Sequence, residues 1–267
     1  MGVYLDSVKT PEFEMRYCRF GQGERAFVIL PGLSVQSVML SADAVAQSYA
    51  SLAEHYTVYL FDRREEVPPE YPVEAMAEDT AEAMAALGLR DVCLFGASQG
   101  GMIAQVIAIR RPELVGKLVL GSTSSHVTDE QYQVLEHWAQ LAKAGDRVGL
   151  YLDFGEKIYP PAVFRQFRDA LIDMAGSVTD AELERFRILA EGTRGFHVTE
   201  QLDQIRCPVL AIGVYEDAVL DSDATLEIAE RLDERADFRL YLYVGFGHAA
   251  FDTAPDYRQR ILDFLRQ

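Results

Sequence analysis

Short runs of mainly apolar residues recur along the chain, and more polar stretches separate them. Six runs have the length and composition of strands, and the first of them is typical of a strand buried on both faces of a sheet. They are residues 26–30, 57–61, 92–95, 117–120, 207–213 and 238–244. Stretches with helical character alternate with these runs, at residues 42–54, 74–87, 102–109, 224–232 and 255–265. Such alternation is typical of a parallel sheet covered by helices.

The first twenty residues have a different pattern. Residues 3–8 and 14–19 are typical of two short strands, and Thr10 and Pro11 form the turn between them. We expect these strands to pair as an antiparallel edge of the sheet. Together with the six buried runs they predict eight strands.

No buried strand is evident between residues 124 and 204, where the pattern predicts four or five helices. Thr128 with Gln131, and Thr179 with Glu182, resemble capping boxes at helix starts. We therefore predict an α/β fold with a mostly parallel eight-stranded sheet flanked by helices, and a helical cap inserted after the sixth strand. Residues 1–123 and 205–267 would form the core, and residues 124–204 the cap.

Composition narrows the class of protein. A length of 267 residues with 49 % hydrophobic content suffices for a large core, and a net charge of −17 argues against a nucleic-acid partner. The three cysteines have no metal-binding spacing and are expected to be buried free thiols. No secretory signal and no apolar run near the ~18 residues of a membrane span is evident. We expect a cytoplasmic protein with no membrane partner.

The strongest chemical signal is the run Gly96-Ala97-Ser98-Gln99-Gly100, which stands between a predicted buried strand and a predicted helix. A serine in such a sharp turn projects its hydroxyl above the edge of the sheet. The flanking glycines permit a close crossing of strand and helix. The positive end of the helix suits an oxygen that becomes negative during a reaction. Ser98 is therefore the candidate nucleophile.

A serine nucleophile needs a histidine base that a carboxylate orients, and in turns of this kind the acid and then the histidine follow the serine in the chain. His248 comes directly after the last predicted strand and is the candidate base, with His126 as the one competitor. Asp217 follows the penultimate strand and is the candidate acid. The adjacent Glu216 is the alternative.

Acyl transfer also needs two N–H groups that stabilise the oxyanion. The backbone N–H of Gln99 directly follows the nucleophile and should supply one. Leu33, in the loop that begins with Pro31-Gly32, is the best candidate for the second, and the Ser34 hydroxyl is a further possible donor.

Taken together, the sequence resembles the α/β-hydrolase superfamily over nearly its whole length. The motifs that carry the resemblance are GASQGG around Ser98, YEDAVL around Asp217 and GFGHAAF around His248, with Leu-Pro-Gly before Leu33 and Phe-Asp-Arg-Arg at 61–64. Where many members of the family have His-Gly, this chain has Pro31-Gly32. It also departs from the family at Glu65-Glu66-Val67, where many members have Gly-x-Gly.

The resemblance implies a serine hydrolase that cleaves a small uncharged ester, thioester or lactone without a metal or organic cofactor, as a monomer or homodimer. A serine nucleophile disfavours the dehalogenase and epoxide hydrolase branches, which attack with aspartate. The alternatives that stay open are a cofactor-free haloperoxidase, a carbon-carbon bond hydrolase and a ligand-binding pseudoenzyme. Cap aromatics such as Trp138 are more often cap core than pocket lining. Most cap arginines are expected to be solvated.

Overall fold

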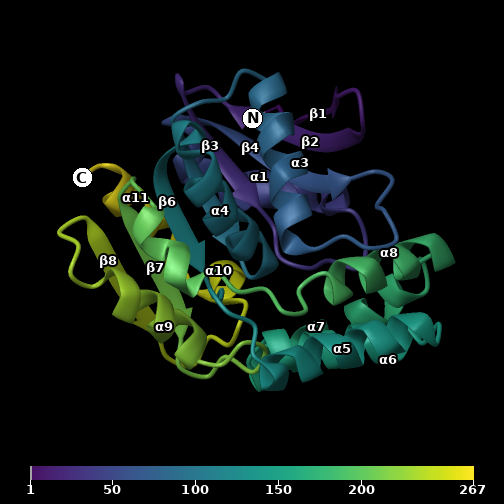
Figure 1. The fold of residues 1–267 in the computed structure, drawn as a ribbon. Helices are drawn as coiled ribbons and strands as arrows, with labels where there is room; N and C mark the ends of the chain where they lie inside the picture. Colours follow the sequence, from purple (N-terminus) through teal and green to yellow (C-terminus); the bar gives the residue numbers. More distant parts are fainter. Residues whose placement is uncertain (1) are drawn as a thin grey trace.

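The computed structural model describes residues 2–267, and eight strands in this part of the chain form one sheet (Figure 1). Their order across the sheet is β1-β2-β4-β3-β5-β6-β7-β8. The strands are β1 (Tyr4–Lys9), β2 (Glu14–Gly21), β3 (Arg25–Leu30), β4 (Tyr56–Arg64), β5 (Val92–Ala97), β6 (Val115–Gly121), β7 (Val209–Val214) and β8 (Phe238–Tyr243).

The sheet is mostly parallel, as the sequence predicts. Strand β2 runs antiparallel to both of its neighbours, β1 and β4, and the strands from β4 to β8 are parallel. The register pairs Leu30 with Gly96 and Ala97 with Gly121. Strands β3, β5 and β6 therefore end at the same level, and the segments that follow them meet at one edge of the sheet.

Helices cover both faces of this sheet. In β5, Val92 and Leu94 belong to one hydrophobic cluster, and Cys93 and Phe95 to the cluster on the opposite face. Helices α3 (Val73–Ala86), α4 (Gln99–Arg110) and α9 (Asp223–Leu232) contribute to the first cluster, and α1 (Ala42–Ser48), α2 (Ala50–Ala53), α10 (Ala250–Thr253) and α11 (Tyr257–Leu265) to the second. Burial on two faces explains why the inner strands β3, β5, β6 and β7 are mainly apolar. The edge strand β8, with the pattern Phe-Arg-Leu-Tyr-Leu-Tyr, is partly exposed.

Several element boundaries differ from the predicted ranges, and two of these differences have a clear physical reason. The helix predicted at 42–54 is interrupted at Tyr49, which has φ −100° and ψ 19° and separates α1 from α2, with a 3₁₀ turn (Val38–Ser41) in front. The Tyr49 ring is buried, and its centroid lies 6.2 Å from that of Phe27. The helix is therefore interrupted at a residue whose side chain packs in the core. The strand expected from residue 207 begins at Val209, after Pro208, which has no N–H to donate.

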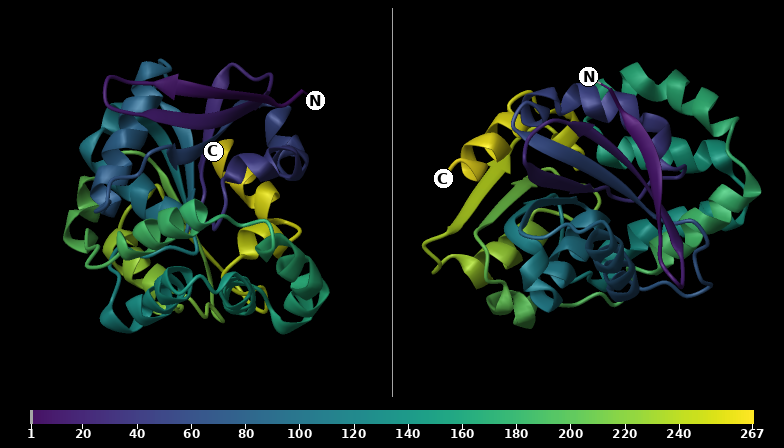
Figure 2. Two further views of the ribbon diagram at one scale, coloured as in Figure 1. Left: turned by 90° about the vertical axis from the view of Figure 1, so that its right-hand side faces the viewer. Right: turned by 90° about the horizontal axis from the view of Figure 1, so that it is seen from above.

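The segment between β6 and β7 is helical. It contains α5 (Asp129–Lys143), α6 (Arg147–Ile158), α7 (Pro161–Ala175) and α8 (Asp180–Glu191), followed by a 3₁₀ helix (Thr199–Gln204). Both capping boxes form, at Thr128 and at Thr179. Figures 1 and 2 show these helices gathered beside one end of the sheet. We refer to α5–α8 as the cap; the three-part division of the chain at residues 123 and 204 stays a prediction.

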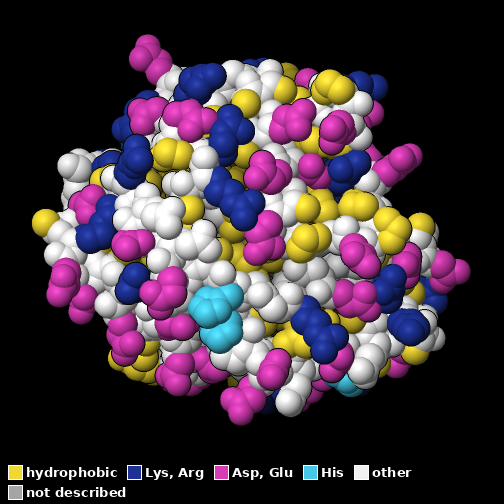
Figure 3. Space-filling view, in the orientation of Figure 1, with side chains coloured by type: hydrophobic (Ala, Val, Ile, Leu, Met, Phe, Trp, Pro, Cys, Tyr) yellow, Lys and Arg dark blue, Asp and Glu magenta, His cyan; other side chains and the backbone are white. Residues whose placement is uncertain are grey.

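Acidic side chains are frequent on the surface, as the composition predicts. Asp and Glu side chains are spread over the face in Figure 3, with Lys and Arg between them. Within residues 2–267, no helix combines the length and the hydrophobicity that a membrane crossing requires. The three cysteines are buried and free, as expected from their spacing.

Candidate active site

Ser98 lies at the junction of β5 and α4, in a strained backbone conformation. Its φ is 52° and its ψ is −123°, a region that non-glycine residues rarely adopt. A Cβ atom at Gly96 would lie 2.3 Å from the Gly100 carbonyl oxygen, and one at Gly100 would lie 2.0 Å from the Leu30 carbonyl oxygen. Both contacts are too short for any side chain, so the two glycines allow strand, turn and helix to cross closely.

Hydrogen bonds from the neighbouring strand hold this turn in place. The Ser98 N–H donates to the Gly121 carbonyl over 2.8 Å, and the Thr123 hydroxyl donates to the Ser98 carbonyl over 2.7 Å. Ser98 itself is half-buried, and α4 begins with the next residue, Gln99. The serine therefore stands at the positive end of a helix, where developing negative charge is stabilised.

His248 and Asp217 form a buried pair. The His248 Nδ1 atom lies 2.8 Å from Asp217 Oδ2. The other carboxylate oxygen, Oδ1, accepts hydrogen bonds from the N–H groups of Val219 (2.8 Å) and Leu220 (3.0 Å). The side chains of His248 and Asp217 are 4 % and 3 % exposed. A carboxylate held in this way orients the imidazole so that Nδ1 carries the proton and Nε2 is free to act as a base.

Glu216, the alternative acid, has a different contact. It is exposed, and its Oε2 accepts a hydrogen bond from the Gly245 N–H over 2.7 Å. Glu216 thus ties the loop after β7 to the loop after β8. Of the two carboxylates, Asp217 is the one that contacts His248.

His126, the alternative candidate base, contacts another histidine. The His126 ring stacks on that of His197, with the ring centroids 4.1 Å apart, and the two residues form an isolated antiparallel bridge at the base of the cap. Elsewhere, His137 lies 3.9 Å from Asp153 and His55 lies 3.1 Å from Arg266. His248 is the histidine that a buried carboxylate orients.

The loop after β3, which contains Leu33, approaches the nucleophile closely. A Cβ atom at Gly32 would lie 3.0 Å from the Cβ of Ser98. Leu33 is half-buried, and Gln99 is 1 % exposed. The fold thus brings both segments that carry the candidate oxyanion donors beside Ser98. The donor roles of the Leu33 and Gln99 N–H groups stay a prediction.

Arg63, the penultimate residue of β4, is a residue that the sequence analysis did not assign to the site. It is 3 % exposed, and burial lowers the pKa of its guanidinium to about 10. Its Nη2 atom donates to the Pro31 carbonyl over 2.8 Å and to Gln99 Oε1 over 3.1 Å. The only sequence feature that pointed to Arg63 was the polar run Asp62-Arg63-Arg64, directly after the apolar run at residues 57–61. That run does not indicate which groups Arg63 contacts.

Known proteins resemble this chain in sequence and in fold. A family model described as alpha/beta hydrolase fold matches residues 25–148, which include β3, the turn at Ser98 and the first cap helix. The chain has the α/β-hydrolase fold, and this match supports its place in the α/β-hydrolase superfamily.

Relatives of this α/β-hydrolase include enzymes and solved structures. A protein of Agrobacterium fabrum that is provisionally named carbamate hydrolase RutD is 28% identical over 228 residues, which are 80% of this chain and 85% of that protein. The structure of MGS-M2, an α/β-hydrolase from a Medee basin deep-sea metagenome library, superposes with a TM-score of 0.86 at 19% identity over 98% of both chains. The enol-lactonase of Burkholderia xenovorans LB400 gives a TM-score of 0.82 at 17% identity, over 98% of this chain and 100% of that chain. The structural likenesses show the fold, and the named relatives identify the chain as an enzyme of the α/β-hydrolase class.

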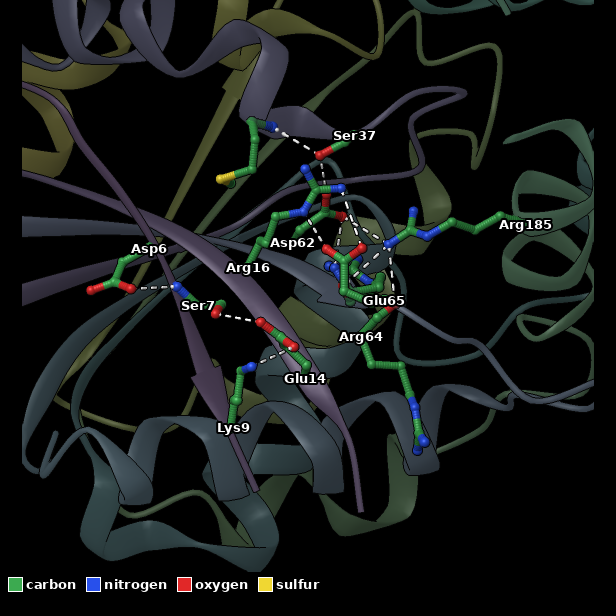
Figure 4. A network of polar contacts seen from close by, with 12 residues as sticks. Asp6, Ser7, Lys9, Glu14, Arg16, Ser37, Asp62, Arg64, Glu65 and Arg185 are labelled. Atoms are coloured by element: carbon green, nitrogen blue, oxygen red, sulfur yellow. Dashed lines mark hydrogen bonds and ion pairs between the residues drawn. The ribbon is translucent and has the colours of Figure 1, made fainter. Parts of the chain in front are cut away.

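In this α/β-hydrolase the cap contacts several of the segments that form the site. Arg185 of α8 donates to Asp62 Oδ1 over 3.0 Å, and the Ser37 hydroxyl donates to Asp62 Oδ2 over 2.5 Å. Figure 4 shows Arg185 reaching across to Asp62, with Ser37 on the other side of the carboxylate. The sequence led us to expect that most cap arginines are solvated, and it did not single out Arg185. Arg185 instead joins the cap to the end of β4.

Further contacts join the cap to the loops of the hydrolase site. Gln36, in the loop after β3, accepts a hydrogen bond from the Tyr151 hydroxyl (3.2 Å) and donates one to Glu182 (3.2 Å). On the opposite side, the Ala249 N–H donates to the Ile158 carbonyl over 2.9 Å, directly after His248. The cap therefore packs on both the candidate oxyanion loop and the histidine loop.

Proposed function

We propose that this protein is a serine hydrolase that cleaves a small uncharged ester, thioester or lactone through Ser98, His248 and Asp217. The observation that carries the proposal is the buried His248–Asp217 pair, 2.8 Å between Nδ1 and Oδ2, on loops at the sheet edge where Ser98 is held in its strained turn. A histidine oriented in this way can accept a proton at Nε2.

In the acylation step, the Ser98 hydroxyl oxygen attacks the acyl carbonyl carbon while His248 Nε2 takes the hydroxyl proton. The carbonyl oxygen becomes an oxyanion, and we assign its stabilisation to the N–H groups of Leu33 and Gln99. The tetrahedral intermediate then expels the alkoxide or thiolate, which receives the proton from His248. Asp217 stabilises the imidazolium that forms in between.

In the deacylation step, water attacks the acyl-serine and gives its proton to His248. The new tetrahedral intermediate collapses with loss of the Ser98 oxygen, which recovers a proton from the imidazolium. The products are the free acid and the original enzyme. Every bond made and broken is accounted for by the substrate, water and these side chains.

The surroundings favour an uncharged acyl substrate. Cap arginines that could bind a substrate carboxylate have partners of their own, since Arg185 pairs with Asp62 and Arg187 pairs with Glu184 and Glu191. The cap aromatic residue Trp138 is 1 % exposed and donates to Asp153 over 2.7 Å, which favours a structural role in the cap. These pairings leave neither Arg185 nor Arg187 free to bind an ionic group of a substrate.

The names of the relatives suggest which acyl compounds to test. A carbamate and an enol-lactone each present a carbonyl carbon bonded to a leaving heteroatom, and both are open to the same attack by Ser98. Neither name fixes the substrate of this chain, because shared fold does not determine function. We therefore include both compound classes beside simple esters.

The test measures hydrolysis of p-nitrophenyl esters from acetate to decanoate, with an aryl carbamate and a simple enol-lactone, by wild-type protein and by Ser98→Ala. We expect turnover of at least one class by the wild type and loss of that turnover in the variant. The acyl chain with the highest kcat/KM gives the size of the site. Equal turnover by both proteins would refute a serine mechanism. Binding of an ester by the folded wild type without turnover would favour the ligand-binding alternative.

A further inference from the structure

Arg63 joins the two segments that carry the proposed oxyanion donors. A single atom, Nη2, donates to the Pro31 carbonyl (2.8 Å) and to the side-chain oxygen of Gln99 (3.1 Å). Pro31 stands two residues before Leu33, and Gln99 directly follows Ser98. Arg63 thus connects the two backbone segments from which the Leu33 and Gln99 N–H groups come.

The Gln99 side chain is also held at its other end. Its Nε2 atom donates to the Leu189 carbonyl in α8 over 2.7 Å. Both Arg63 and Gln99 are buried, at 3 % and 1 % exposure. A continuous set of hydrogen bonds therefore runs from the loop after β3, through Arg63 and the turn at Ser98, to the cap. Rigid donors stabilise an oxyanion best because they need no reorganisation during the reaction.

The charge of Arg63 is only partly compensated. Asp62, its nearest carboxylate in the chain, also accepts from the Arg185 guanidinium (3.0 Å) and the Ser37 hydroxyl (2.5 Å). Asp62 forms its ion pair with Arg185, and the buried Arg63 guanidinium has only the Pro31 carbonyl and the Gln99 amide oxygen as direct partners among the described residues. The Nε atom of Arg63 is buried without a hydrogen-bond partner among the described residues. This charge contrasts with the acidic protein around it, and it stands beside Gln99, where negative charge would develop.

We propose that Arg63 is a positioning residue of the oxyanion hole: it sets the spacing of the Leu33 and Gln99 N–H groups, and its buried charge favours the oxyanion. The inference rests on the serine hydrolase function proposed above. A purely structural arginine would contribute to folding stability alone. A positioning residue also changes how tightly the folded enzyme binds the transition state.

The experiment separates these two roles with a trifluoromethyl ketone. The Ser98 oxygen adds to the ketone carbon, its proton passes to His248, and the ketone oxygen becomes a hemiketal oxyanion. The corresponding secondary alcohol fills the same site without forming an oxyanion. For wild type and variants we measure the inhibition constant of the ketone, the Kd of the alcohol, and kcat and KM for the best ester, all per folded active site.

The central variant is Arg63→Met. We expect kcat/KM and ketone affinity to fall together, by about tenfold to a hundredfold, because the N–H donors remain but lose their fixed spacing. The loss should appear in kcat, with KM and alcohol affinity changed by less than about threefold. Arg63→Lys should recover part of the loss, since an ammonium keeps the charge without the planar fork of the guanidinium.

Arg235→Met is the matched control. Arg235 also donates to main-chain carbonyls, those of Ile205 and Cys207, and it lies before β8 near the start of β7, at the opposite end of that strand from Asp217. It should lower stability and leave the ketone inhibition constant unchanged.

Different outcomes contradict different claims. If folded Arg63→Met binds the ketone within about twofold of wild type, the positioning role is wrong while the serine mechanism stands. If Ser98→Ala hydrolyses the ester as well as wild type does, the proposed function itself is wrong. If Arg63→Met does not fold, Arg63→Lys and Gln99→Met carry the same test, because each disturbs the Arg63–Gln99 bond and keeps the backbone N–H groups. Unchanged ketone affinity in both would overturn the proposal.

Discussion

The Asp217 carboxylate uses its two oxygens for two different purposes: Oδ1 accepts two backbone N–H groups of its own loop, and Oδ2 lies 2.8 Å from His248 Nδ1. The first set of bonds holds the carboxylate rigidly, and the second holds the imidazole. A change that leaves the shape of Asp217 intact and alters its donors and acceptors should therefore affect the histidine directly.

Asp217→Asn tests this arrangement. The amide can present its N–H₂ group to Nδ1, which favours the tautomer with the proton on Nε2 and removes the base. We expect kcat to fall by about 10³-fold to 10⁴-fold with the fold intact. Steady-state kinetics and circular dichroism measure the two effects.

Glu216→Gln is the control for that variant. The glutamine oxygen can still accept the Gly245 N–H, so kcat should stay within about threefold of wild type. A loss in Glu216→Gln as large as that in Asp217→Asn would contradict the assignment of Asp217 as the acid.

The turn at Ser98 should not tolerate side chains on its flanking glycines. Alanine at Gly100 would place its Cβ 2.0 Å from the Leu30 carbonyl oxygen, so the strand, helix or loop must move. We expect Gly100→Ala to lower the free energy of unfolding by about 3 kcal/mol or more and to abolish turnover. Urea denaturation gives the first quantity.

Gly176→Ala provides the comparison, because Gly176 ends α7 with φ −64° and an added Cβ would come no closer than 3.3 Å to Asp173. Its stability should change by less than about 1 kcal/mol. If the two alanine variants lost similar amounts of stability, the close crossing at Gly100 would not be the cause of the loss in Gly100→Ala.

Loss of the Arg185–Asp62 pair should lower stability far more than loss of the Arg187 pairs on the same helix. The Arg185 and Asp62 side chains are 18 % and 5 % exposed, and removal of one partner leaves the other charge buried. We expect Arg185→Met to cost about 3 kcal/mol of unfolding free energy and to reduce turnover. Arg187→Met, which removes exposed pairs with Glu184 and Glu191, should cost less than about 1 kcal/mol. Equal costs would mean that the pair does not anchor the cap.

Much of this architecture follows from local pattern. The apolar runs predicted the inner parallel strands β3, β5, β6 and β7 because these are mostly buried, whereas the edge strand β8 is partly exposed. Gly96-Ala97-Ser98-Gln99-Gly100 predicted the turn because few other sequences allow it. The contacts of Arg63 and Arg185 could not be read in the same way. Each depends on which segments the fold brings within a few ångströms, and a charged residue after a strand has the same local pattern whether it is buried or solvated.

The buried thiols should make the protein less stable at alkaline pH. Burial raises the pKa of both Cys18 and Cys207 to about 11, whereas an unfolded thiol titrates near about 8.5. The unfolded state therefore loses protons first, so the stability present below about pH 8.5 declines as pH rises toward 11.

Urea denaturation at pH 7.5 and 9.5 measures this decline. In Cys207→Ser the difference between the two pH values should be smaller than in wild type by about 1 kcal/mol, since one titrating group is gone. An unchanged difference would show that Cys207 does not titrate in the way its burial indicates.

The most direct test of the central claim is covalent labelling of the folded protein with a fluorophosphonate, followed by mass spectrometry of the peptides. Ser98 attacks the phosphorus and displaces fluoride, and the proton passes to His248. We expect one label per chain on Ser98, no label in Ser98→Ala, and much slower labelling in His248→Ala. Folded wild-type protein that takes up no label, or carries it on another residue, would contradict the assignment of Ser98 as the nucleophile.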